Sequence, residues 1–127
     1  MHQYNLPQEI EVWYVIPAIR RELTKLLTKK HGLSYDKAGA ALGITKAAIS
    51  QYINNKRASN INLHPLVLQE IEKSAKKIIK DKKVMVSEIS RILKFMRNKH
   101  LSFEVCREVR GEEECSEAKV TYEKYWD

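Results

Sequence analysis

Hydrogen-bonding and small side chains gather in residues 45–57, at a spacing that suits one exposed face of a short helix. Glutamine and asparagine amides can pair with adenine, lysine can reach guanine, and alanine can lie against a thymine methyl group. A basic end and a hydroxyl at the helix start suit neighbouring phosphates. The candidate contact residues are Thr45, Lys46, Ala47, Ser50, Gln51, Asn54, Asn55, Lys56 and Arg57. Their pattern predicts a surface that reads base edges in the major groove of DNA.

Two short helices, placed almost back to back, would position this surface. Ser34 is suited to cap a first helix that Gly43 closes, and Thr45 is suited to cap a second. A helix-turn-helix needs a small residue where the helices cross, a glycine in the tight turn and an apolar residue on the inner face of the second helix. Gly39, Gly43 and Ile49 meet these needs at spacings of four and six residues.

The segment before this motif also predicts helical structure. Pro17 suits the first turn of a helix that ends at Gly32, because its fixed φ and missing N–H cost little there. Residues 8–16 are apolar enough for a preceding helix or a short strand, and we expect the chain to bend at Pro17 where the two elements meet.

The C-terminal half predicts two amphipathic helices and an ambiguous end. Residues 65–80 place apolar side chains on one stripe and lysines elsewhere, and a second helix follows with a stripe formed by Ile89, Ile92, Leu93 and Met96. That stripe must be buried, either within one chain or between two. We expect a homodimer, because a protein that reads half of a site gains affinity by pairing. Residues 101–127 fit a helix, a strand or an irregular tail, and a helix is favoured at their start.

These patterns predict an all-α fold in one small protein. We expect a helix-turn-helix bundle in residues 1–62 and a C-terminal helical dimerisation and tail region in residues 63–127, with a small irregular or β tail as the alternative for the end of the chain.

The charge distribution favours a polyanionic partner. The chain of 127 residues carries a net charge of +7, divided as +5 in residues 1–64, +6 in residues 65–101 and −4 in residues 102–127. Nucleic acid is the first candidate for the partner of the basic part, and an anionic membrane surface is the second. The longest apolar run, residues 12–16, is far too short to span a membrane, and no basic segment precedes an apolar one at the N-terminus. We therefore expect a soluble, cytoplasmic protein.

The stretch LGITKAAISQYINNKR, residues 42–57, resembles the Cro/C1-type (XRE-like) helix-turn-helix. The wider run of residues 6–57 is similar to a group of archaeal transcriptional regulators with the pattern PAIR…LGIT…AISQY…KR. The resemblance implies a helical DNA-binding domain whose second helix, about Thr45 to Asn54, lies in the major groove, usually as a dimer on a two-fold site. Gly39 departs from the family pattern, which more often has alanine there.

The resulting hypothesis is a transcriptional regulator that binds specific double-stranded DNA and is not an enzyme. The sequence has no glycine-rich phosphate loop, paired-carboxylate signature or nucleophile elbow. The alternative is a protein-interaction adaptor, such as an antitoxin or coactivator, whose acidic tail engages a partner. An adaptor has no need of Lys46, Gln51 and Asn54 pointing outward together, so their pattern favours DNA.

Two cysteines, Cys106 and Cys115, are separated by eight residues, and Gly111 lies among these eight. A turn at this glycine would let them form a disulfide, and the alternatives are free thiols or a metal shared across a dimer. Regulators similar to this chain carry further cysteines that suggest a metal or iron–sulfur site. A four-ligand zinc site needs more donors at closer spacing than His100 and the two cysteines provide, so we expect no cofactor.

Overall fold

The structure is a computed structural model that describes residues 6–110, and all of the regular structure in this range is helical. The α-helices are α1 Pro7–Ile10, α2 Ile16–Lys25, α3 Tyr35–Leu42, α4 Lys46–Ile53, α5 Pro65–Lys80, α6 Met85–Asn98 and α7 Leu101–Arg110. Two π-helical segments, Glu11–Val15 and Leu26–Lys30, and a 3₁₀ turn, Lys82–Val84, complete the elements. The predicted all-α fold is confirmed, as is the helix favoured after residue 100. Among the described helices, none is both long and apolar enough to cross a membrane.

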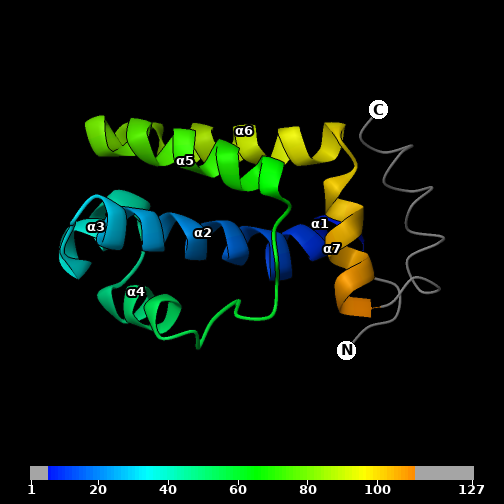
Figure 1. Ribbon diagram of the computed structural model, residues 1–127, viewed down its shortest axis with the longest axis horizontal. Helices are drawn as coiled ribbons and strands as arrows, with labels where there is room; N and C mark the ends of the chain where they lie inside the picture. Colours follow the sequence, from blue (N-terminus) through cyan, green and yellow to red (C-terminus); the bar gives the residue numbers. More distant parts are fainter. Residues whose placement is uncertain (1–5, 111–127) are drawn as a thin grey trace.

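A continuous helix from Pro7 to Lys30 runs through the middle of the molecule (Figure 1). The predicted place of Pro17 is confirmed, because α2 begins at Ile16 and Pro17 lies in its first turn. The helical alternative for residues 8–16 is also confirmed, and helical structure continues across the boundary. The Ile16 N–H donates to the Glu11 carbonyl, five residues back, which is the π-helical pattern. Proline has no N–H and its ring crowds the carbonyl four residues before it. A wider turn just before Pro17 accommodates the ring without ending the helix.

The other helices pack on two sides of this long helix (Figure 1). Helices α5 and α6 lie side by side along one side of it, α4 lies on the other side, and α3 lies at the end of the long helix next to α4. Helix α7 crosses the end of the bundle and contacts α1 and α6. One hydrophobic core joins these layers and draws on α2, α4, α5 and α6, with Leu23, Ile49, Ile71 and Ile92 as examples of fully buried side chains. One core therefore joins residues 1–62 and residues 63–127, the two regions that the sequence analysis distinguished, within the described part of the chain.

The apolar stripe of α6 is buried within the single chain. Its members, Ile89, Ile92, Leu93 and Met96, are each at least nine-tenths buried and belong to the common core. The stripe therefore supplies no free interface for a dimer. On α5 the predicted stripe holds except at its edge, where Ile79 remains 39% exposed beside the turn into α6.

A polar cluster ties α5 to α6 beneath the exposed lysines. Arg91 Nη1 donates to Glu70 Oε1 at 2.5 Å, and Glu88 Oε1 accepts from Ser74 Oγ at 2.8 Å and from Arg91 Nε at 3.2 Å. Burial acts to raise the pKa of Glu88, but the hydrogen bonds from Ser74 and Arg91 outweigh it, so that the pKa lies below its ordinary value of 4.5. The hydrogen bond from Arg91 is the main cause that lowers the pKa of Glu70. Both carboxylates are thus held in their charged form.

A second ion pair joins elements from the two ends of the described chain. Glu11, which is buried, accepts two hydrogen bonds from Arg97, at 2.8 Å from Nε and 2.7 Å from Nη2. This bidentate contact links the long helix to α6, and hydrogen bonding to Glu11 is the main cause that raises the pKa of Arg97.

Candidate nucleic-acid interface

Helices α3 and α4 form a helix-turn-helix with the predicted caps. Ser34 Oγ accepts from the Lys37 N–H at 3.2 Å at the start of α3, and Thr45 Oγ1 accepts from the Ala48 N–H at 3.0 Å at the start of α4. Gly43 follows α3 with φ +68°, a left-handed conformation that glycine adopts at little cost. Both predicted caps and the predicted turn are confirmed.

The two helices cross closely at Gly39. A Cβ atom added to Gly39 would lie 2.7 Å from the Ile44 carbonyl oxygen and 3.7 Å from the Ile49 side chain. The Gly39 carbonyl also accepts from the Ile44 N–H at 3.0 Å, which closes the turn. This crossing accounts for the glycine at a position where the resembling family more often has alanine.

Helix α4 divides into a buried row and an exposed row. Ala48, Ile49 and Tyr52 are buried against the core. The exposed row consists of Thr45, Lys46, Ala47 and Asn54, which are exposed, and Ser50 and Gln51, which are half-buried. The sequence-predicted contact residues of α4 therefore share one accessible face.

The polar groups of this face are weakly engaged. Thr45 uses its oxygen as the helix cap, which leaves its hydroxyl proton available for donation. Lys46 Nζ lies 3.8 Å from Asp36 Oδ2, but both side chains are exposed, so this contact contributes little. Asn54 Nδ2 donates to Ser50 Oγ at 3.2 Å, also in the solvent-exposed layer. These groups can exchange their present contacts for hydrogen bonds to a ligand at low cost.

A basic turn follows the end of α4. Asn55 takes a left-handed conformation at φ 56°, and Lys56 and Arg57 follow it at the surface. The Arg57 guanidinium lies 5.8 Å from the centre of the Tyr52 ring, within reach of a cation–π contact. The nine sequence-predicted contact residues thus lie at the N-cap of α4, on α4 itself and in the turn that follows it.

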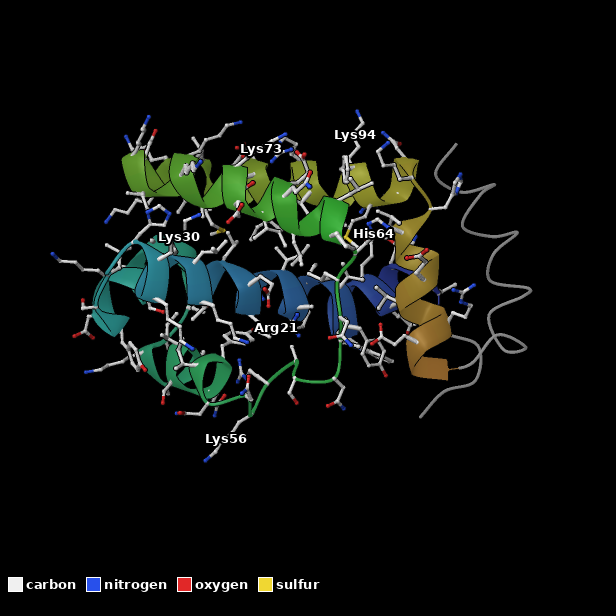
Figure 2. All side chains as sticks on the ribbon, in the orientation of Figure 1. Arg21, Lys30, Lys56, His64, Lys73 and Lys94 are labelled. Atoms are coloured by element: carbon white, nitrogen blue, oxygen red, sulfur yellow. The ribbon has the colours of Figure 1, made fainter. Side chains whose placement is uncertain are left out.

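The lysines of α5 and α6 lie on the opposite side of the molecule from the basic turn after α4. Figure 2 shows Lys56 reaching away beneath α4, whereas Lys73 and Lys94 point away on the other side, over α5 and α6. Lys30 Nζ and Lys73 Nζ each lie 3.0 Å from a carboxylate, of Glu72 and Glu70 respectively. The lysine run of α5 is therefore remote from the predicted reading face.

Arg21, which the sequence patterns did not single out, supports the turn after α4. Arg21 of α2 is buried, and its guanidinium donates to the carbonyls of Ala58 and Ile61. Ala58 has φ 54°, an unusual conformation for alanine, which these contacts hold in place. No local signal marks Arg21, because an arginine in an amphipathic helix is ordinarily assigned to the exposed face.

The predicted disulfide or metal site at the cysteines lies outside the described residues. Cys106 belongs to α7, whose backbone is described, but Cys115 falls beyond residue 110. Within residues 6–110 no group of three or more His, Cys, Asp or Glu side chains is placed to hold a metal ion. The pairing of Cys106 with Cys115 stays a prediction, which mass measurement with and without reductant would test through a two-dalton difference.

Comparison with known families supports the helix-turn-helix. Residues 25–73 match the family model described as Helix-turn-helix, which covers the end of the long helix, α3, α4 and the first part of α5. This family consists of DNA-binding regulators and is not typically enzymatic. No curated protein matches the chain. No solved structure matches it either.

Proposed function

We propose that the protein is a transcriptional regulator that binds specific sequences in double-stranded DNA through α4. The observation that carries the proposal is the division of α4, with an apolar row packed in the core and amide, hydroxyl and lysine side chains on the accessible face. The helix-turn-helix match over residues 25–73 supports the same role.

In this proposal α4 enters the major groove, where some side chains contact bases and others contact phosphates. Gln51 and Asn54 pair with adenine through their amides, Lys46 reaches guanine, and Ala47 and the Ser50 hydroxyl contact neighbouring base edges. Thr45, at the start of the helix, donates its hydroxyl proton to a phosphate. Asn55, Lys56 and Arg57 hold the phosphates that pass the end of the helix.

We further propose that two chains bind a two-fold site. A single helix of eight residues reaches few base pairs, and pairing two readers raises both affinity and the length of sequence read. Because the α6 stripe is buried in the monomer, the dimer must use other surfaces. Light scattering with and without the selected duplex tests this step, and a strict monomer at tens of micromolar in both conditions contradicts it.

Selection of bound sequences from random DNA, followed by two substitutions, tests the reading role. Gln51→Ala should cost about 1–3 kcal/mol on the selected site and relax the preference at one base pair, because a bidentate contact is lost without a change in charge. Arg57→Ala should weaken binding to all duplexes alike and reduce the salt slope by about one unit.

Lys94→Ala is the matched control, because it removes one exposed charge on the opposite side of the molecule (Figure 2). It should leave both the salt slope and the sequence preference unchanged. A folded Gln51→Ala variant with unaltered affinity and preference would contradict the reading role, and the interaction adaptor would become the better hypothesis.

A further inference from the structure

A groove lies beside the end of α4, between the long helix, the turn after α4 and α7. Its volume is about 820 Å³, within the range of roughly 300–1,000 Å³ that is typical of small-molecule sites. Trp13, Pro17 and Arg20 of the long helix line one wall, and they share one helical face because they are four and three residues apart. Tyr52 lines it from α4, and residues 56–61 form the opposite wall.

The lining combines aromatic rings with positive charge. Trp13, Tyr14 and Tyr52 supply the aromatic surface. Arg20, Lys56 and Arg57 carry the positive charges, and Glu108 of α7 is the single acidic residue among the lining side chains. The Glu108 carboxylate is already engaged, because its Oε1 accepts from the backbone N–H and the side-chain amide of Asn62 at 3.3 Å each. The groove therefore offers a net positive surface.

Arg20 carries an unsatisfied hydrogen-bond donor in the wall of the groove. Its Nε atom is buried and has no hydrogen-bond partner. By contrast, the buried Arg21 donates to two backbone carbonyls, and Arg91 and Arg97 both bind carboxylates. A buried guanidinium donor without a partner carries a desolvation cost that an anionic acceptor would remove.

The turn after α4, which forms one wall of the groove, is held in place by hydrogen bonds. Arg21 holds the carbonyls of Ala58 and Ile61 from inside, and Ala58 is kept in a left-handed conformation. Conformations of this kind persist where the surrounding structure fixes them, and they are frequent at ligand sites. The groove is thus largely formed before a ligand arrives.

We propose that this groove binds a small planar aromatic molecule that carries a carboxylate or a phosphate. The ring packs against the indole of Trp13, which is 45% exposed, and Arg20 pairs with the anion. A planar guanidinium suits both anions, because it can donate two parallel hydrogen bonds to either.

Resting on the proposed function, the same site would make DNA binding sensitive to the ligand. Lys56 and Arg57 line the groove and are also the proposed phosphate contacts. A bound anion neutralises part of their charge, so ligand and DNA should weaken each other's binding by the same factor. The ligand would then be an effector that releases the protein from DNA.

Calorimetry on the full chain without DNA tests the site itself. The anionic probes are adenosine monophosphate and indole-3-acetate, and the uncharged probes are adenosine and indole. We expect at least one anionic probe to bind at least tenfold more tightly than its uncharged counterpart. In a Trp126→Phe background, its addition should shift the indole N–H resonance of Trp13. Binding of adenosine monophosphate would indicate a phosphate ligand, and binding of indole-3-acetate would indicate a carboxylate ligand.

Two variants tie this binding to Arg20. Arg20→Gln should weaken the anionic probe at least tenfold and leave the uncharged probe unchanged, and Arg20→Lys should recover part of the loss. Lys94→Gln, remote from the groove, should change neither. Circular dichroism of each variant checks that it is folded.

Failure of both anionic probes to bind at 5 mM would overturn the proposal. So would binding that Arg20→Gln does not weaken. If instead Arg20→Gln weakens every DNA duplex while neither probe binds, the groove is an extension of the phosphate-contacting surface and the ligand site is wrong. Probe binding by a protein that binds no duplex would leave the site in place and remove the proposed function.

Discussion

Arg21 Nη1 lies 2.6 Å from the carbonyl oxygen of Ile61, forty residues later in the chain. The same guanidinium donates to the Ala58 carbonyl, and its Nε lies 2.8 Å from Glu22 Oε2. A buried side chain of α2 therefore fixes the turn that carries Lys56 and Arg57. The position of the basic end of the proposed reading surface depends on a residue that is itself out of reach of DNA.

Replacing Arg21 with methionine should destabilise the protein by about 2–3 kcal/mol, because the buried Ile61 carbonyl and the part-buried Ala58 carbonyl lose a charged donor while much of the side-chain volume remains. DNA affinity should also fall for all sequences, because the turn is no longer held. Urea denaturation measures the first effect and fluorescence anisotropy the second. The adjacent Arg20→Met is the control, and an equal loss of stability there would show that the carbonyl contacts are not the cause.

Gly39→Ala should destabilise the fold although alanine is the better helix former. Alanine gains about 1 kcal/mol in helix propensity, but its Cβ would lie 2.7 Å from a backbone oxygen that cannot move without opening the turn. Crowding of this kind costs roughly 1–3 kcal/mol, so we expect a net loss of up to about 2 kcal/mol. Thermal unfolding measures it. A higher melting temperature would mean that the helices do not cross as closely as described.

The polar cluster between α5 and α6 should make stability depend on acidity. Because the pKa of Glu88 and that of Glu70 lie below 4.5 in the folded chain, the unfolded chain binds protons first as the pH falls. Their contribution is present above about pH 4.5 and is lost as the pH falls through their lowered pKa values. Glu88→Gln should therefore reduce the slope of unfolding free energy against pH below 4.5. Glu104→Gln, at an exposed position on α7, is the control and should leave the slope unchanged.

Ile92→Ala should lower the stability of the single chain by about 2–5 kcal/mol, because the side chain is fully buried in the common core. The urea concentration at the midpoint of unfolding should fall, and this decrease should be equal at 2 and at 200 micromolar protein. A fall that becomes smaller at the higher concentration would show that the α6 stripe is buried between chains instead.

The local parts of the fold could be predicted from the sequence, because their causes lie within a few residues. The caps at Ser34 and Thr45, the turn at Gly43 and the two rows of α4 all follow from near neighbours. The place of Pro17 in the first turn of α2 follows in the same way, whereas the π-helical turn that joins α2 to the preceding helix leaves no mark in the residue pattern.

The long-range contacts could not be predicted in the same way. Glu11 and Arg97 are 86 residues apart, and a pattern that assigns charged residues to the surface cannot pair them in the interior. The destination of the α6 stripe was open for a similar reason, since an apolar face has the same sequence whether it packs within a chain or between chains. The groove at Arg20 arises only when three separated segments meet.

The two rows of α4 have separate roles: the buried row stabilises the fold, and the accessible row is free to determine what the helix binds. Ala48, Ile49 and Tyr52 are constrained by the core, whereas Ala47 and Gln51 face away from it. If α4 reads DNA as proposed, duplicated copies of the gene could diverge in the DNA sequence they bind by exchanging accessible side chains alone. The same freedom would let an engineer replace the accessible side chains of α4 and change what this helix binds without redesigning the interior.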